Sequence, residues 1–137
     1  MGSATSGVRQ SGQEKASEMT DPEIEAYLKQ RAYPEHVWRA GRQGLIERWR
    51  GFVDLVESGY PLHLEDYRND LDLRALIARL GLQPEASEAD RRFRSLLVFT
   101  QEPIWECENP DAFWIFGYPR NAGSDLLRDL EAEGVLG

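Results

Sequence analysis

The fold is decided by residues 33–82, which read YPEHVWRAGRQGLIERWRGFVDLVESGYPLHLEDYRNDLDLRALIARLGL. Pro34 suits the first position of a helix, because its missing N–H is not needed there and its fixed φ is already helical. Gly59 suits the left-handed residue just past a helix end, and Gly81 gives a second stop signal. The stretch therefore predicts a long helix over residues 34–58, a turn at 59–61 and a second helix over 64–80.

Apolar side chains recur at helical spacing in both predicted helices. In the second helix their phase shifts near Asn69, which leaves a kink there open. The connection is short enough to make the two helices antiparallel neighbours, so we expect a helical hairpin at the core. The first apolar face carries Trp38, Leu45, Trp49, Phe52 and Val56, and the second carries Leu64, Tyr67, Leu71, Leu73, Leu76, Ile77 and Leu80.

The composition is that of a small globular protein. The chain has 137 residues, with 41% hydrophobic and 10% aromatic residues. Its formal net charge of −8 argues against nonspecific binding of nucleic acid or of an anionic membrane. No apolar run approaches the roughly 20 residues that span a bilayer, and the N-terminus lacks the apolar segment of a signal peptide. The single cysteine, Cys107, excludes an internal disulfide, so we expect a cytoplasmic protein. The strong preference for Arg over Lys suggests a bacterial source.

The chain outside the hairpin begins with a polar tail. Residues 1–19 contain almost nothing to bury, so we predict a disordered N-terminal tail there. A single mostly helical domain is then predicted over residues 20–137. Thr20 and Glu23 have the spacing of a capping box, which predicts a short helix that ends near Gln30.

Two further helices are predicted toward the C-terminus. Ser87 and Asp90 form a second capping box, which predicts a helix after a loop over residues 82–86. Ser124 is the predicted cap of a last helix over residues 125–133. The predicted contact face of this helix is Leu126, Leu127 and Leu130.

Between these two helices the pattern changes to that of strands. Residues 104–108 alternate apolar and acidic side chains, as a half-buried strand does, and residues 112–116 are continuously apolar. The tripeptide 109–111, Asn-Pro-Asp, favours a turn between them. The run 96–100 fits a buried strand or a helix equally well. The sequence thus predicts a mainly α fold: an antiparallel helical hairpin core with flanking short helices and a small C-terminal β-hairpin.

The aromatic hairpin is the first candidate site. A strand that is apolar on both faces needs two covers, and aromatic side chains beside an arginine are typical anchors for a protein partner. The alternative is that the last helix covers the outer face and completes the core. The predicted partner-binding residues are Trp105, Phe113, Trp114, Phe116, Tyr118 and Arg120.

A second candidate site is a metal site. His63, Asp66 and Asp70 are spaced by three and four residues, which places them on one helical face where they could bind a divalent cation. Ordinary roles also explain them. His63 suits a helix cap, Asp66 suits the positive end of the helix dipole, and Asp70 could pair with Arg74 four residues on.

Two weaker patterns complete the search for chemistry. Cys107 could act as a nucleophile with His36 or His63 as base, but a lone cysteine beside apolar residues is typical of a buried side chain. The basic cluster of Arg91, Arg92 and Arg94 reads as a solvated helix face that pairs with nearby acids, with a ligand site as the alternative.

The sequence favours a small, acidic, non-enzymatic binding or regulatory protein. We expect a protein partner or a second copy of the chain, bound through the aromatic hairpin or an acidic helix face, and we expect no cofactor. An adaptor, or an inhibitor of the immunity or antitoxin type, fits this description. The alternative is a small metal-dependent enzyme that uses His63, Asp66 and Asp70.

Overall fold

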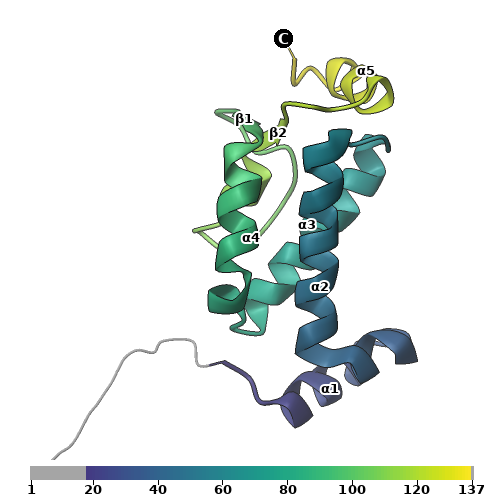
Figure 1. The fold of residues 1–137 in the computed structure, drawn as a ribbon, viewed down its shortest axis with the longest axis vertical. Coiled ribbons are helices and arrows are strands. Elements are labelled where there is room, and N and C mark those ends of the chain that lie inside the picture. The colour runs from purple at the N-terminus through teal and green to yellow at the C-terminus, as the bar shows by residue number, and fades with distance from the viewer. Residues whose placement is uncertain (1–17, 137) are drawn as a thin grey trace, which may run out of the picture.

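The computed structural model describes residues 18–136, and the predicted disordered tail lies outside them except for Glu18 and Met19. The mainly α class, with a helical hairpin and a small antiparallel sheet in the C-terminal part, is confirmed (Figure 1). The elements are α1 (Asp21–Gln30), α2 (Glu35–Gly59), α3 (Leu64–Arg79), α4 (Gln83–Ser95), β1 (Leu97–Phe99), the 3-10 helix η3 (Phe113–Ile115), β2 (Gly117–Pro119) and α5 (Ser124–Ala132).

Helices α2 and α3 form the predicted hairpin. Gly59 and Gly81 both have positive φ, at 106° and 76°, as expected for glycines that end helices. Helix α3 runs past Asn69 as one continuous helix, so the phase shift in its apolar pattern does not mark a break. Helix α1 lies across one end of α2, whereas α5 lies near its other end (Figure 1).

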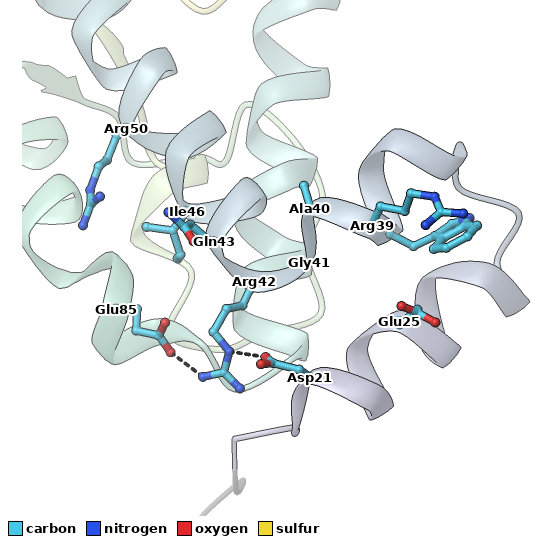
Figure 2. Close-up of a pocket in the computed structure, with 11 residues that line it drawn as sticks. Asp21, Glu25, Arg39, Ala40, Gly41, Arg42, Gln43, Ile46, Arg50 and Glu85 are labelled. Carbon is cyan, nitrogen blue, oxygen red and sulfur yellow. Dashed lines mark hydrogen bonds and ion pairs between the residues drawn. The ribbon is translucent and has the colours of Figure 1, made fainter.

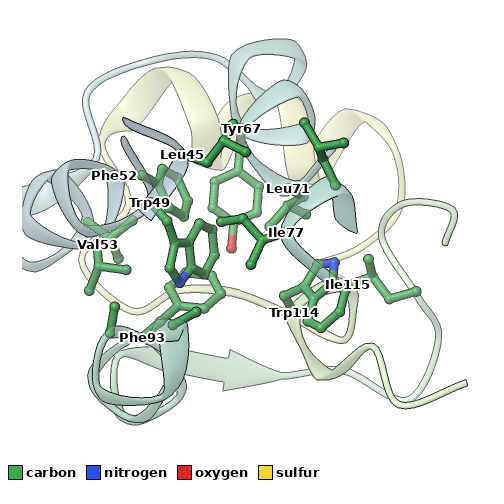
Figure 3. Close-up of a cluster of buried hydrophobic side chains, with 14 of the residues drawn as sticks. Leu45, Trp49, Phe52, Val53, Tyr67, Leu71, Ile77, Phe93, Trp114 and Ile115 are labelled. Atoms are coloured by element: carbon green, nitrogen blue, oxygen red, sulfur yellow. The ribbon is translucent and has the colours of Figure 1, made fainter. Parts of the chain in front are cut away.

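Aromatic rings join α2, α3 and α4 in the core (Figure 3). The ring of Phe52 lies at the centre of this cluster. Its centroid is 5.1 Å from that of Trp49, 5.7 Å from Tyr67 and 5.4 Å from Phe93. Each such pair contributes about 0.5–1.5 kcal/mol beyond the burial of its area. The three helices are therefore held by contacts that none of them could make alone.

The flanking helices confirm some predicted signals and correct others. Thr20 and Glu23 form the predicted capping box of α1. Helix α4 begins at Gln83, so the predicted loop over 82–86 and the predicted capping box at Ser87 are both wrong. The reason is that Pro84 lies in the first turn of α4, where a missing N–H costs nothing. In α5, Leu126 and Leu130 are buried as predicted, whereas Leu127 is 37% exposed.

The small sheet forms from other residues than those predicted. Strands β1 and β2 pair antiparallel, with Val98 opposite Tyr118, so the open question about residues 96–100 is resolved as a strand. Residues 104–108 are irregular and residues 113–115 form η3. The strand predicted over 112–116 is wrong because these residues close a 3-10 turn, in which the N–H of Phe116 donates to the carbonyl oxygen of Phe113 at 3.1 Å.

Helix α2 is bent at Gly41, where φ is 59° and ψ is −146°. Residues other than glycine rarely adopt this backbone conformation. The bend also brings Ala40 close to Gly44: a Cβ added to Gly44 would lie 2.4 Å from the Cβ of Ala40. These two glycines thus allow the start of α2 to bend and to pack against α1.

We predict that Gly41→Ala lowers the free energy of unfolding by about 1–3 kcal/mol, the cost of backbone strain at a position with positive φ. The matched control is Gly51→Ala in the straight part of the same helix, where an added Cβ meets no atom within 4 Å. The control should raise stability by about 0.5–1 kcal/mol. Urea unfolding measures both, and equal effects would contradict a required bend.

Candidate functional site

The aromatic residues proposed to bind a partner lie at different depths in the structure. Trp114 is 1% exposed and belongs to the core (Figure 3). Its ring centroid lies 4.3 Å from the guanidinium carbon of Arg74, and it meets the Phe113 ring edge to face at 5.5 Å. The prediction that Trp114 contacts a partner is therefore wrong. Helix α3 covers the face that a partner would need.

The remaining members of the set lie nearer the surface. The indole N–H of Trp105 donates to Asp72 at 2.6 Å, and the guanidinium carbon of Arg94 lies 4.3 Å from the Phe113 ring centroid. Both rings thus contact polar or charged side chains of the same chain. Trp105, Phe113 and Tyr118 are half-buried, whereas Phe116 and Arg120 are exposed.

Two exposed apolar side chains that sequence reasoning missed lie near Phe116. Val98 and Phe99 are 37% and 58% exposed, and Phe116 is 36% exposed. The N–H of Thr100 donates to the carbonyl oxygen of Phe116 at 3.0 Å, which brings the ends of the two strands together. We name Val98, Phe99 and Phe116 the sheet patch; because Val98 and Phe99 are adjacent in β1, their side chains point to opposite faces of the sheet, and the patch spans both faces. The only sequence signal was the apolar run 96–100, which fitted a buried segment as well.

An ion pair between a buried arginine and a partly buried aspartate lies between α3 and α4. Arg74 is 1% exposed, and its Nε and Nη2 donate to the two carboxylate oxygens of Asp90 at 2.8 and 2.7 Å. The indole N–H of Trp49 donates to the same carboxylate at 2.9 Å. The sequence instead suggested Asp70 as the partner of Arg74. Helical spacing identifies neighbours on one helix but not a partner from another.

The three proposed metal ligands have separate roles. His63 is the N-cap of α3, and its Nδ1 lies 3.0 Å from Oδ2 of Asp129 in α5. Asp66 accepts a hydrogen bond from the backbone N–H of His63 at 3.2 Å. Asp70 accepts one from the Tyr60 hydroxyl at 2.9 Å, and burial raises the pKa of its carboxyl group.

These contacts do not assemble the proposed metal site. Within residues 18–136, no group of three or more His, Cys, Asp or Glu side chains is placed to hold a metal ion. Cys107 is a free, half-buried thiol, and His36 is exposed on α2. The geometry therefore gives no support to the metal-dependent alternative or to a cysteine nucleophile.

The bend in α2 borders a cavity of about 630 Å³ (Figure 2). Arg42 crosses this region and pairs with three carboxylates, those of Glu18, Asp21 and Glu85. Trp38, which also lines the cavity, is flanked by the cations of two neighbouring side chains. The ion pairs of Arg42 thus join α1, α2 and α4 at this cavity.

Comparisons with known protein families, with curated proteins and with solved structures gave no match. In the part of the chain from residue 18 to 136, no helix has both the length and the apolar content needed to cross a membrane.

We predict that Trp114→Ala lowers the free energy of unfolding by about 3–5 kcal/mol, because it removes a large buried ring and leaves a cavity. Phe116→Ala, two residues away, should cost less than about 1 kcal/mol because its side chain is partly exposed. Denaturant unfolding of the two variants measures the difference. A folded Trp114→Ala variant with near-normal stability would contradict its place in the core.

We predict a pH-dependent contribution from the contact between His63 and Asp129. The hydrogen bond to Asp129 raises the pKa of His63, and the hydrogen bonds from Leu64 N–H and His63 lower the pKa of Asp129. The raised histidine pKa gives stabilisation that is present below the ordinary value of about 6.5 and lost as pH rises through the folded value. The lowered aspartate pKa gives stabilisation that is present above about 3.9 and lost as pH falls.

His63→Gln should therefore reduce stability more at about pH 5 than at about pH 8.5. His36→Gln, at the exposed histidine of α2, is the control and should show no such difference. Urea midpoints at the two pH values test this, and parallel shifts in both variants would contradict the contact.

Proposed function

We propose that this protein is a non-enzymatic binding protein that docks a protein partner through the sheet patch. The observation that carries the proposal is the 58% exposure of Phe99, the most exposed of the three side chains of the sheet patch. Aromatic side chains are enriched among the residues that dominate binding energy at protein interfaces. An apolar ring left in water is a cost that a bound partner would remove.

The backbone of β1 supports an extended partner segment. The carbonyl oxygen of Leu96 accepts from Arg120 N–H at 2.8 Å, and Thr100 N–H donates to Phe116. Hydrogen bonding alternates along an antiparallel strand, so the peptide groups of Phe99 point away from β2. Such an open edge can pair with an added strand, and its neighbouring apolar side chains then provide specificity.

The charge of the protein supports a basic partner. A formal net charge of −8 would speed the encounter with a positively charged surface and disfavour acidic competitors. The single cysteine fits action in the reducing cytoplasm. An adaptor and an inhibitor of the immunity or antitoxin type both agree with these properties.

We predict that Phe99→Asp strongly weakens partner binding and leaves the fold intact, because it places a charge where an apolar side chain would be desolvated. Tyr33→Asp, at a 36% exposed ring in the connection between α1 and α2, is the matched control. Affinity purification from the native host with wild-type protein identifies the partner. Titration calorimetry with that purified partner should then give a Kd raised at least about 30-fold for Phe99→Asp and nearly unchanged for the control.

Two outcomes decide the proposal further. If Phe99→Asp and Tyr33→Asp bind the purified partner equally well, the sheet patch is not the docking surface. Sedimentation of the isolated protein tests whether the partner is a second copy of the chain. In that case a concentration-dependent dimer would form with wild type and with Tyr33→Asp, and would be lost in Phe99→Asp.

A further inference from the structure

A second cavity lies between α3, α4 and η3, next to the ion pair that joins α3 and α4. Its volume is about 360 Å³, which lies within the range of small-molecule sites. Its lining includes side chains from all three elements, so the site exists only in the folded chain. The residues that concern us are Arg74, Ser87, Arg91, Arg94, Phe113 and Trp114.

The cavity is locally basic although the protein is acidic. Asp90 also lines it, but its carboxylate is neutralised by the two hydrogen bonds from Arg74. Asp111 is then the one remaining acid of the lining, against Arg91 and Arg94. The guanidinium of Arg94 is held over the Phe113 ring at 4.3 Å, at the edge of the cavity.

The third arginine of the sequence cluster behaves differently. Arg92 pairs with Asp54 at 2.6 Å and with Glu57 at 2.9 Å, both on α2. The three arginines that the sequence suggests as one basic face therefore lie on two sides of α4. Arg92 makes the predicted ion pairs on one side, whereas Arg91 and Arg94 line the cavity on the other.

Two buried donors beside the cavity lack acceptors. Nη1 of Arg74 and Nε1 of Trp114 have no hydrogen-bond partner among the residues that the structure describes, and both residues are 1% exposed. These nitrogens can donate but cannot accept. A buried donor without an acceptor costs about 1–3 kcal/mol. Because the guanidinium stacks on the indole at 4.3 Å, one acceptor group with several oxygens could serve both.

We infer that this cavity binds a small oxyanion, the phosphate or carboxylate group of a small ligand. Both nitrogens are closed to solvent in the structure, so the anion accepts hydrogen bonds from Arg74 and Trp114 once a lining side chain has moved aside. Arg91 and Arg94 supply the opposite charge at the outer end, where their exposed side chains can move aside to admit the ligand. A water molecule could accept the same bonds, but it carries no charge to match the two arginines.

The test follows the indole N–H signals of the four tryptophans in ¹H–¹⁵N spectra. Inorganic phosphate and acetate are added in separate titrations, with chloride used to keep the ionic strength constant. Either anion should shift the Trp114 signal in a saturable way and leave that of Trp38, which is near α1, unmoved. The anion that binds more tightly assigns the site to phosphate or to carboxylate ligands.

Variants on α4 distinguish a built site from general charge screening. The double variant Arg91→Gln, Arg94→Gln should weaken binding at least about tenfold, as expected for the loss of two charged contacts. Arg92→Gln changes the charge of the same helix outside the cavity and should bind as wild type does. Unmoved Trp38 and Trp105 signals show that each variant is folded.

Two results would overturn the inference. One is the absence of a saturable Trp114 shift with both anions, which would leave water as the acceptor. The other is equal weakening by Arg92→Gln and by the double variant, which would reduce the effect to screening. Loss of partner binding in Phe99→Asp leaves these spectra unaffected, so the two proposals fail independently.

Discussion

The structure depends on one partly buried carboxylate, that of Asp90. It accepts two hydrogen bonds from Arg74 of α3 and one from Trp49 of α2, while it belongs to α4 itself. Arg74 in turn stacks on Trp114 of η3. Replacement of such a pair by apolar residues is often neutral, but removal of one partner leaves an uncompensated charge that costs about 3–5 kcal/mol. The pair therefore favours one packing of α2, α3, α4 and η3. A shift of α4 along its axis would separate the two charges and leave each without its partner.

The ion pair of Asp90 and Arg74 helps to form a rigid centre, and the surfaces proposed to bind lie around it. The aromatic cluster around Phe52 and the ion pair lie between the same helices, so polar and apolar contacts favour the same arrangement. Binding sites are most effective when they are carried by rigid elements. The sheet patch follows α4 directly in the chain, and the basic cavity lies on the side of α4 that faces η3. Both proposed sites are thus positioned by the helix that Asp90 anchors.

Several predictions from local sequence signals succeeded, although the capping box predicted at Ser87 did not, because α4 begins four residues earlier at Gln83. The glycines at 59 and 81 and the capping box at Thr20 act within a few residues, so their effect was readable without knowledge of the fold. The predictions of strands at 104–108 and 112–116 failed. The continuous apolar run was interpreted as a strand with both faces covered, but a run of this kind is also buried in a 3-10 turn. Trp114 instead has its cover from α3, and the 3-10 turn directs it and Ile115 inward together.

The sequence by itself determined the helical hairpin, the mainly α class and the acidic character, because helical periodicity, end signals and charge are properties of the chain. Only the tertiary structure decided that Arg74 pairs with Asp90 rather than Asp70, that His63 meets Asp129, and that Phe99 rather than Trp114 is exposed. Spacing along a helix defines which side chains share a face. What that face meets is set by the packing of elements distant in sequence, and this is where the candidate sites of the protein arise.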